Sequence, residues 1–207
     1  KGLRNQLVTT IRDKGIKNKK VLDAMSKVPR HLFMDSGFVD FAYQDKPFPI
    51  GADQTISQPY TVAFQTELLE VQPGHKILEI GTGSGHQTAV LIELKAEVYS
   101  IERQKELYTK AKKFLPKVGY VPKKLVYGDG YIGLTENAPF DGIIVTAGAP
   151  YVPNALLGQL KIGGKLVIPV GDDVQVMTVF TRTAEKKFEK LEYGDFRFVP
   201  MLKEKNS

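Results

Sequence analysis

Three glycines at alternating positions follow a short apolar run in the segment 77–86, which reads Ile-Leu-Glu-Ile-Gly-Thr-Gly-Ser-Gly-His. The apolar residues predict a strand over 76–80, and Gly81, Gly83 and Gly85 let the backbone turn sharply and approach a ligand without a Cβ atom in the way. A helix predicted over 86–94 points its free N–H groups and the positive end of its dipole at the space above the loop. Together these features predict a nucleotide-cofactor site.

Glu102 is the second residue that could take part in chemistry here. It ends the next predicted strand, over 96–102, and therefore lies beside the glycine loop. A carboxylate in that place can accept hydrogen bonds from both hydroxyls of a ribose. The alternative at this point is a glycine-rich turn without a ligand, because a glycine motif alone has low specificity.

The spacing of the glycines narrows the kind of cofactor. A dinucleotide site needs the pattern G-x-G-x-x-G, and the sixth position here is His86, so the pattern disfavours a pyrophosphate ligand. The form E-x-G-x-G-x-G, with Glu79 before the glycines, resembles motif I of the methyltransferases that depend on S-adenosyl-L-methionine (AdoMet). The resemblance implies that AdoMet, or its product S-adenosyl-L-homocysteine, binds at this loop with its ribose on Glu102.

Composition restricts the class of protein further. The chain has 207 residues and 42% hydrophobic content, which fits one domain with a full core. It has no apolar run near 18 residues, and its first residues lack the apolar region of a signal peptide, so we expect a cytoplasmic protein that makes no membrane contact. Zero cysteines exclude disulfides and thiol catalysis, and three widely separated histidines show no metal-ligand spacing, so we expect no metal.

The net charge of +6 comes largely from runs of lysine around residues 17–20 and 110–124. Such runs are usually solvated helix faces. The alternative is attraction to acidic substrates or to nucleic acid, and charge alone does not decide between them.

The pattern along the chain predicts an α/β fold. Apolar residues at helical spacing indicate a helix from Leu3 to about Gly15 and a second helix that begins at an Asn18 cap and ends before Pro29. A long irregular stretch, Val28 to Gln58, follows, and loops of that length are usually functional. From Pro59 on, a helix to about Val71 precedes an alternation of strands at 76–80, 96–102, 124–127, 141–146 and 165–170 with helices at 86–94, 104–115 and 153–160.

That alternation predicts a Rossmann-like, doubly wound and mostly parallel sheet. Strands at 174–182 and 188–201 then suggest an antiparallel addition at one edge, which gives seven strands in all. We expect a single domain over 1–207, in which 1–58 forms an N-terminal helical and irregular cover and 59–207 forms the cofactor-binding core.

In an open parallel sheet, the ligand binds at the carboxyl ends of the strands, beside the first strand. Residues at these ends therefore share one cleft, among them the segment 146–150 and Asp129, whose carboxylate could accept the exocyclic amine of an adenine. The alternative for Asp129 is a simple Asp-Gly turn. The expected cofactor-binding residues are Glu79, Gly81, Thr82, Gly83, Ser84, Gly85, Glu102, Asp129 and Gly130.

Four segments together resemble the protein-L-isoaspartate O-methyltransferase family: 28–33 (Val-Pro-Arg-His-Leu-Phe), 49–60, the glycine loop and 196–201. The segment 49–60 is the most specific, because many methyltransferases share the glycine loop but not the pattern Gly-x-x-Gln-Thr-Ile-Ser-x-Pro, which this segment contains. The resemblance implies transfer of a methyl group from AdoMet to the free α-carboxylate of L-isoaspartyl residues in damaged proteins and peptides. The resulting ester collapses to a succinimide, and hydrolysis returns some normal aspartate.

The chemistry of this reaction needs little from the protein. A carboxylate with a pKa near ~3.9 is already ionised at neutral pH, so no general base is required, and the sequence shows no obvious base near the cleft. The remaining task is to align the carboxylate with the methyl group, and alignment can contribute up to roughly 7–11 kcal/mol. A closing cover would orient the carboxylate and remove water from it.

Ser57 is the residue that we expect to contact the substrate, through a hydroxyl bond to the isoaspartyl group, and the resemblance adds Thr55, Ile56, Arg197 and Val199 as neighbours of the peptide. Ser57 or Gln58 could equally cap the helix that starts at Pro59. Arg197 could equally be a surface charge at a strand end.

Two other functions remain at this stage. An RNA or DNA methyltransferase would suit the basic surface, but Asn/Asp-Pro-Pro-aromatic is absent after the fourth strand, where the chain reads Thr-Ala-Gly-Ala-Pro over 146–150. A non-catalytic AdoMet-binding module would have lost the substrate-side segment, and 54–59 is intact. We therefore expect a repair enzyme that acts on isoaspartyl proteins as a monomer, without nucleic acid.

Overall fold

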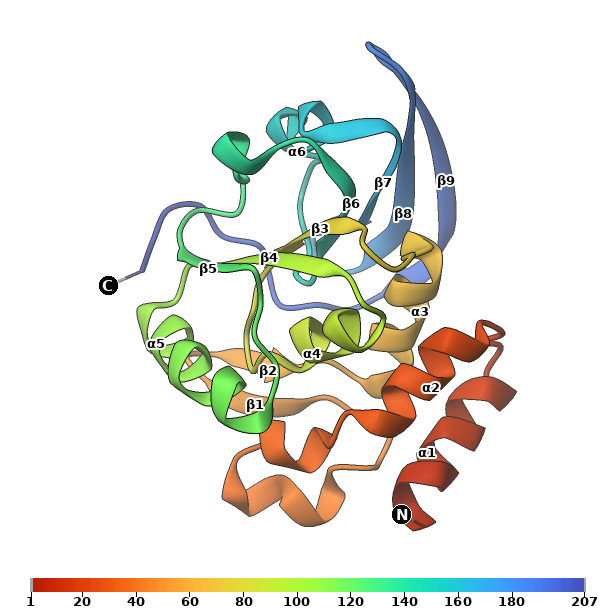
Figure 1. Cartoon of the computed structure of the whole chain (residues 1–207), viewed down its shortest axis with the longest axis vertical. Coiled ribbons are helices and arrows are strands. Elements are labelled where there is room, and N and C mark those ends of the chain that lie inside the picture. The colour runs from red at the N-terminus through yellow and green to blue at the C-terminus, as the bar shows by residue number, and fades with distance from the viewer. Residues whose placement is uncertain (1, 207) are drawn as a thin grey trace.

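A seven-stranded sheet forms the centre of the molecule in the computed structural model, which describes residues 2–206 (Figure 1). Lys1 and Ser207, the two ends of the predicted domain, lie outside the described residues. The strand order is β5-β4-β3-β6-β7-β8-β9. The strands are β3 (Lys76–Ile80), β4 (Glu97–Glu102), β5 (Lys124–Tyr127), β6 (Phe140–Val145), β7 (Leu160–Val170), β8 (Gln175–Ala184) and β9 (Lys187–Phe196).

The first five of these strands are parallel, and β8 and β9 continue the sheet antiparallel to β7. This confirms the predicted doubly wound sheet with an antiparallel edge. The chain proceeds from β3 outward to β4 and β5 and then returns to the other side of β3 with β6. The order therefore reverses beside β3, which is the place where such sheets bind their ligands.

Helices cover both faces of the sheet. They are α1 (Gly2–Asp13), α2 (Lys19–Lys27), α3 (Pro59–Leu69), α4 (His86–Glu93), α5 (Lys105–Phe114) and α6 (Asn154–Gly158). Helices α1 to α5 contribute to one large cluster of buried apolar residues on one face of the sheet. Leu156 of α6 belongs to a second cluster on the opposite face. Strands β3 and β6 are almost entirely buried, as expected for parallel strands covered on both faces.

The cap of α2 confirms a sequence prediction. The side chain of Asn18 accepts hydrogen bonds from the backbone N–H groups of Lys20 and Val21. These are two of the donors that the first turn of a helix leaves without a partner.

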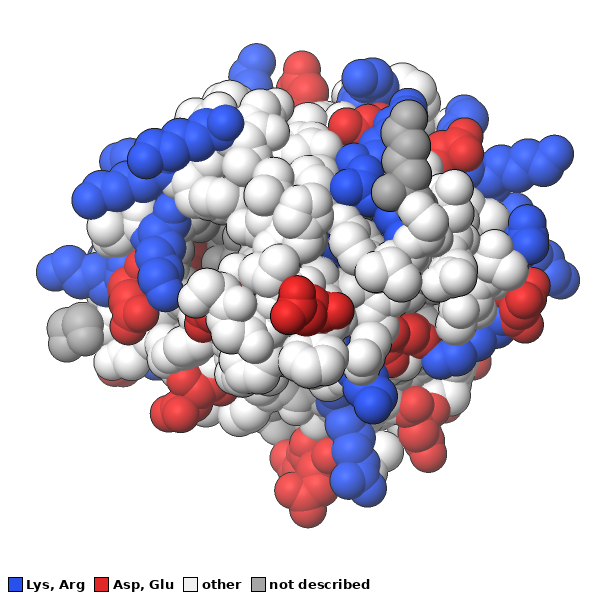
Figure 2. Space-filling model, turned by 90° about the horizontal axis from the view of Figure 1, so that it is seen from below, with Lys and Arg blue, Asp and Glu red and all other residues white. Residues whose placement is uncertain are grey.

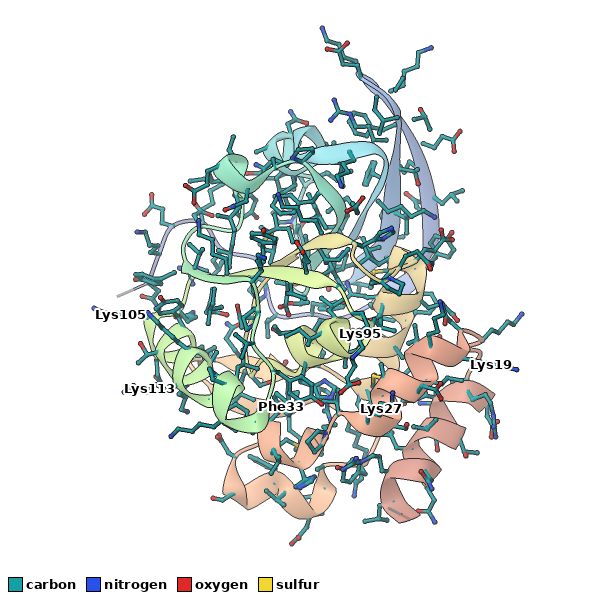
Figure 3. All side chains as sticks on the ribbon, in the orientation of Figure 1. Lys19, Lys27, Phe33, Lys95, Lys105 and Lys113 are labelled. Atoms are coloured by element: carbon teal, nitrogen blue, oxygen red, sulfur yellow. The ribbon has the colours of Figure 1, made fainter. Side chains whose placement is uncertain are left out.

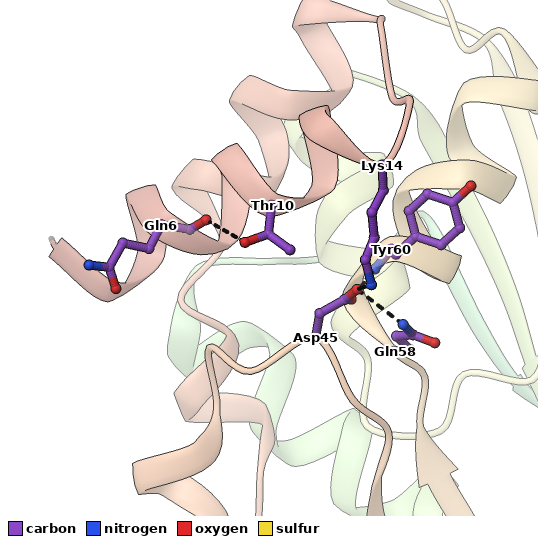
Figure 4. A network of polar contacts seen from close by, with 6 residues as sticks. All are labelled: Gln6, Thr10, Lys14, Asp45, Gln58 and Tyr60. Atoms are coloured by element: carbon purple, nitrogen blue, oxygen red, sulfur yellow. Dashed lines mark hydrogen bonds and ion pairs between the residues drawn. The ribbon is translucent and has the colours of Figure 1, made fainter.

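The structure does not support the alternative role of Ser57 or Gln58 as a cap of α3, because neither caps that helix with its side chain. Instead, Oδ1 of Asp45 accepts a hydrogen bond from the backbone N–H of Tyr60 at 2.7 Å, and Oδ2 accepts one from the Gln58 amide at 3.0 Å (Figure 4). Lys14 pairs with the same carboxylate. An acid from the preceding segment thus stabilises the start of α3 and leaves the Ser57 side chain free of this role.

The segment 28–58 is more regular than we predicted. It contains two short 3₁₀ helices, η1 (Arg30–Phe33) and η2 (Ser36–Phe41), and an antiparallel hairpin of β1 (Phe48–Gly51) and β2 (Gln54–Ile56). The hairpin turns through Ala52 and Asp53, both with positive φ. Its strands are too short for a periodic sequence signal, and their stability depends on packing, for example of buried Ile50 and Ile56.

The last strand ends earlier than predicted, at Phe196 instead of Met201. Beyond it the chain leaves the sheet, because Val199 and Met201 bond to Gly148 instead: the Gly148 N–H donates to the Val199 carbonyl at 2.8 Å, and the Met201 N–H donates to the Gly148 carbonyl at 2.7 Å. The segment 197–206 then crosses below the sheet toward α5 (Figure 1). It passes the carboxyl ends of β3, β4 and β5 and so reaches the predicted cleft.

Charged side chains are distributed over the surface. Lys105 and Lys113 project outward from α5, whereas Phe33 points into the molecule (Figure 3). On the face shown in Figure 2, most basic and acidic residues lie around a largely uncharged area, near the middle of which an acidic side chain projects. Between residues 2 and 206, no helix has the length and apolar character to cross a membrane.

Candidate active site

The glycine loop after β3 is held against the neighbouring strands by its own backbone. The N–H of Gly81, at φ +93°, donates to the Ile101 carbonyl at 2.9 Å, and the Thr146 hydroxyl bonds to the Ile80 and Gly81 carbonyls at 2.9 and 2.7 Å. A Cβ atom at Gly81 would lie 2.6 Å from the Thr146 hydroxyl oxygen. The loop therefore requires glycine at this position both for its φ angle and for space.

Glu102 lies beside the loop, as predicted, and its carboxylate is only partly occupied. Oε2 accepts the N–H of Gly83 at 2.9 Å, and Oε1 accepts the N–H of Gln104 at 2.8 Å. Each oxygen keeps a further acceptor position. Glu102 is 4% exposed yet lines the cleft, and burial raises the pKa of its carboxyl above the ordinary value, opposed by these backbone hydrogen bonds. A ligand with two adjacent hydroxyls matches these free positions.

Glu79 lies beneath the loop and not in the cleft, which the sequence could not show. It is fully buried, and its Oε2 accepts hydrogen bonds from the hydroxyls of Thr88 at 2.6 Å and Ser100 at 2.8 Å. Ser100 in turn shares a hydrogen bond of 2.6 Å with the Thr82 hydroxyl in the loop. Glu79 therefore connects to the cofactor loop through Ser100 and does not reach the cleft surface.

One cleft brings together most of the predicted cofactor-side and substrate-side residues. It has an empty volume of about 850 Å³ and opens at the carboxyl ends of β3 and β4. From the predicted set it is lined by Thr55, Ile56, Ser57, Gly81, Thr82, Gly83, Ser84, Glu102, Gly130 and Val199. Residues from the β1–β2 hairpin thus face the glycine loop across one space.

Besides Glu79, three predicted residues lie outside that lining. Gly85 is buried at the start of α4, where a Cβ atom would lie 2.7 Å from a Leu115 methyl carbon, so it serves packing. The carboxylate of Asp129 accepts the N–H groups of Tyr131 at 2.8 Å and Glu204 at 2.9 Å, which supports the turn interpretation and links it to the C-terminal segment. Arg197 lines a separate, open groove beside the cleft.

Sequence reasoning did not identify several lining residues. The C-terminal segment contributes Pro200, Met201 and Leu202, and the start of α5 contributes Gln104. Arg103 holds that segment by donating to the carbonyls of Lys203 and Glu204. No local pattern signals this arrangement, because it depends on contacts between residues about a hundred positions apart.

His86 also lines the cleft, although the sequence showed no obvious base there. It is 2% exposed and packs edge-to-face against Phe33, with the two ring centroids 5.6 Å apart. Burial, and then the nearby positive charge of Arg30, lowers the pKa of its imidazole well below the ordinary value of 6.5. The ring is therefore neutral near pH 7 and a weak base.

Among residues 2–206, the structure shows no group of three or more His, Cys, Asp or Glu side chains that could hold a metal ion.

Sequence comparison places this site in a known family. The chain matches the protein-L-isoaspartate(D-aspartate) O-methyltransferase family over residues 3–206. The chain belongs to this family. A protein-L-isoaspartate O-methyltransferase of Christiangramia forsetii is 67% identical over 205 residues, which cover 99% of this chain and 96% of that protein. Another, of Flavobacterium johnsoniae, is 64% identical over the same length, with the same coverage.

A solved structure agrees with the sequence comparison. A putative protein-L-isoaspartate O-methyltransferase of Plasmodium falciparum, in complex with S-adenosyl-L-homocysteine, superposes with a TM-score of 0.83 at 26% identity and covers 96% of this chain and 98% of that one. These relationships confirm the predicted fold, the enzyme class and AdoMet as methyl donor. They do not favour a nucleic-acid methyltransferase. Thr146 begins the segment where the base-binding motif of such enzymes would lie, and its hydroxyl donates hydrogen bonds to the backbone at the start of the glycine loop.

Proposed function

We propose that this protein-L-isoaspartate O-methyltransferase binds AdoMet in the cleft with the ribose hydroxyls on Glu102, and orients the free α-carboxylate of an isoaspartyl residue with the Ser57 hydroxyl. The observation that carries this proposal is the position of Glu102 and Ser57 in the lining of one cleft, together with the glycine loop. Isoaspartyl-containing proteins and peptides are the substrates, in line with the names of the relatives.

The free acceptor positions of the cleft support AdoMet as the ligand. Glu102 lines the cleft, and each of its carboxylate oxygens accepts one backbone N–H, while burial raises the pKa of the carboxyl above its ordinary value. Two ribose hydroxyls would supply the missing donors. The adenine would then lie toward Gly130 and Met201, near Asp129, whose carboxylate is already bonded to two backbone N–H groups.

The protein's part in the reaction is binding, alignment and exclusion of water. AdoMet supplies an electrophilic methyl group on a sulfonium, and a carboxylate oxygen displaces a neutral thioether. The substrate carboxylate needs no base, and His86, neutral and weakly basic, is not required as one. The Ser57 hydroxyl donates a hydrogen bond to one oxygen of the substrate carboxylate. Because this bond fixes the orientation of the carboxylate, its other oxygen points at the methyl group and attacks it.

Ser57 does not cap α3, and this supports its proposed role in substrate binding. Asp45 stabilises the first turn of α3 with its Oδ1 atom, so the Ser57 hydroxyl has no backbone partner from that helix. Ser57 is half-buried at the boundary between the hairpin and α3 and faces the cleft.

Methyl transfer from labelled AdoMet tests the proposal. An L-isoaspartyl peptide should be methylated, whereas its twin with a normal aspartyl residue should not. Equal labelling of both peptides, or labelling of RNA in preference to either, would contradict the proposed function. The prediction that the chain acts as a monomer is tested separately by light scattering, which should give a mass near 23.0 kDa.

A further inference from the structure

An open groove adjoins the cleft on the side of α3 and β9. Its empty volume is about 1540 Å³, against about 850 Å³ for the cleft, and it lies open to solvent. Its lining combines residues at and near the start of α3 (Gln58, Tyr60 and Phe64) with residues at and near the end of β9 (Tyr193, Phe196 and Arg197). The reaction described above uses none of its aromatic residues.

Four aromatic rings, those of Tyr60, Phe64, Tyr193 and Phe196, line this groove and contact one another. The Phe64 ring stacks between Tyr60 and Phe196, with centroids 5.7 and 5.3 Å away, and meets the edge of Tyr193 at 6.3 Å. Tyr193 is 40% exposed, and the other three rings are half-buried. Aromatic rings that are packed on one side and open on the other form a firm apolar platform that costs little entropy when a ligand binds.

The groove continues the substrate side of the cleft along both of its walls. On one wall, Ser57 lines the cleft and the next residue, Gln58, lines the groove. On the other wall, Val199 lines the cleft, and Arg197 and Phe196 line the groove. A chain that enters the cleft with one residue therefore continues along the groove with its neighbours.

The groove wall is fixed in place by contacts that do not involve a substrate. Asp45 holds the first turn of α3, which carries Tyr60, and Lys14 lies 5.7 Å above the Tyr60 ring. The strand β9 is the last of the sheet, so one side of its backbone has no neighbouring strand. An extended peptide beside this edge would find the rings already in position, which lowers the cost of binding.

We propose that this groove binds the polypeptide next to the isoaspartyl residue and selects an aromatic or large apolar side chain there. The inference rests on the proposed function, because it takes Ser57 as the point where the isoaspartyl residue sits. An extended chain advances roughly 3.3 Å per residue. With the neighbouring centroids 5.3 to 6.3 Å from that of Phe64, the platform is long enough to contact about two neighbouring residues of an extended chain.

The experiment compares isoaspartyl peptides that differ at one flanking position. Phe or Gly is placed two or three residues from the isoaspartate, in one series on its N-terminal side and in another on its C-terminal side. We expect a higher kcat/KM for the Phe peptide in one series, by about 2- to 12-fold, which is the range for an aromatic contact beyond simple burial. The difference should lie in KM and not in kcat.

Tyr193→Ala should reduce this Phe-to-Gly ratio toward one, because it removes the most exposed ring of the platform. Leu191→Ala is the matched control, since Leu191 is 59% exposed on the same strand and lies outside the groove. It should keep the wild-type ratio. The S-adenosyl-L-homocysteine affinity of both variants, measured by calorimetry, reports whether the cleft is intact.

Three results would overturn the proposal. The first is a wild-type ratio near one in both series, with the Gly peptides still methylated, which leaves the proposed function standing. The second is an equal loss of the ratio in the Leu191→Ala control. The third is a concentration-dependent dimer that Tyr193→Ala abolishes, which would assign the groove to a second copy of the chain. Failure to methylate any isoaspartyl peptide would instead contradict the proposed function.

Discussion

The backbone N–H of Gly83 donates a hydrogen bond of 2.9 Å to Oε2 of Glu102, so the cofactor loop and the carboxylate beside it are fixed to each other before any ligand binds. The bond joins the loop after β3 to the end of β4, two elements that lie side by side in the parallel sheet. A pre-formed carboxylate of this kind can receive a diol without a large rearrangement.

Replacing Glu102 tests its proposed contact with the ribose. Glu102→Ala should weaken binding of S-adenosyl-L-homocysteine by about 1–3 kcal/mol, because two ribose hydroxyls lose a charged acceptor. Calorimetry measures the change. Glu97→Ala, at the exposed start of the same strand, should leave the affinity unchanged. Equal affinities of wild type and a folded Glu102→Ala protein would contradict the assignment.

Ser57 and Asp45 should separate substrate binding from helix stability. Ser57→Ala is expected to lower methylation of an isoaspartyl peptide while cofactor affinity and thermal stability stay close to wild type. Asp45→Ala removes the cap of α3 and should lower the free energy of unfolding by about 1 kcal/mol. Methylation assays and thermal unfolding of both variants check this. A Ser57→Ala protein that unfolds earlier and keeps full turnover would reverse the two roles.

The buried carboxyl of Glu79 should make the free energy of unfolding depend on pH. Burial raises the pKa of its carboxyl from 4.5 to about 8, so between these values the folded state holds a proton that the unfolded state releases. The free energy of unfolding contributed by this group is therefore greatest below pH ~4.5 and falls as the pH rises toward ~8. Glu79→Gln imitates the neutral acid and should remove this loss, which amounts to roughly 2–4 kcal/mol between pH 5 and 8.

Urea unfolding at several pH values measures that difference. Wild type and Glu79→Gln should diverge as the pH rises, whereas Glu97→Gln, at an exposed position, should follow the wild-type profile. Parallel profiles for wild type and Glu79→Gln would show that the buried carboxyl ionises normally.

The pH profile of the chemical step tests the absence of a catalytic base. With cofactor saturating, single-turnover methylation should be nearly flat from about pH 6 to 7.5, because the substrate carboxyl titrates well below this window. The imidazole of His86, with its lowered pKa, stays neutral throughout. A step in this window that disappears in a folded His86→Gln protein would reveal a base that the proposed mechanism lacks.

The sequence alone was sufficient to predict the parallel core and the cofactor loop. Strand β3 and the glycine loop carry local signals, since an apolar run followed by glycines with positive φ has few other structural solutions. The place of Glu102 followed from the same rule, because residues at the carboxyl ends of neighbouring parallel strands meet at one edge. The family resemblance then supplied the substrate.

Only the tertiary structure shows those features that depend on contacts between residues far apart in the chain. Asp45, and not Ser57, caps α3, because a carboxylate from an earlier segment happens to reach the free N–H groups there. Glu79 lies under the loop because β3 is covered on both faces, so its side chain meets Thr88 and Ser100 and not the cleft. The C-terminal wall and the aromatic groove likewise join residues that are far apart in the chain, and local sequence patterns carry no information about such pairs.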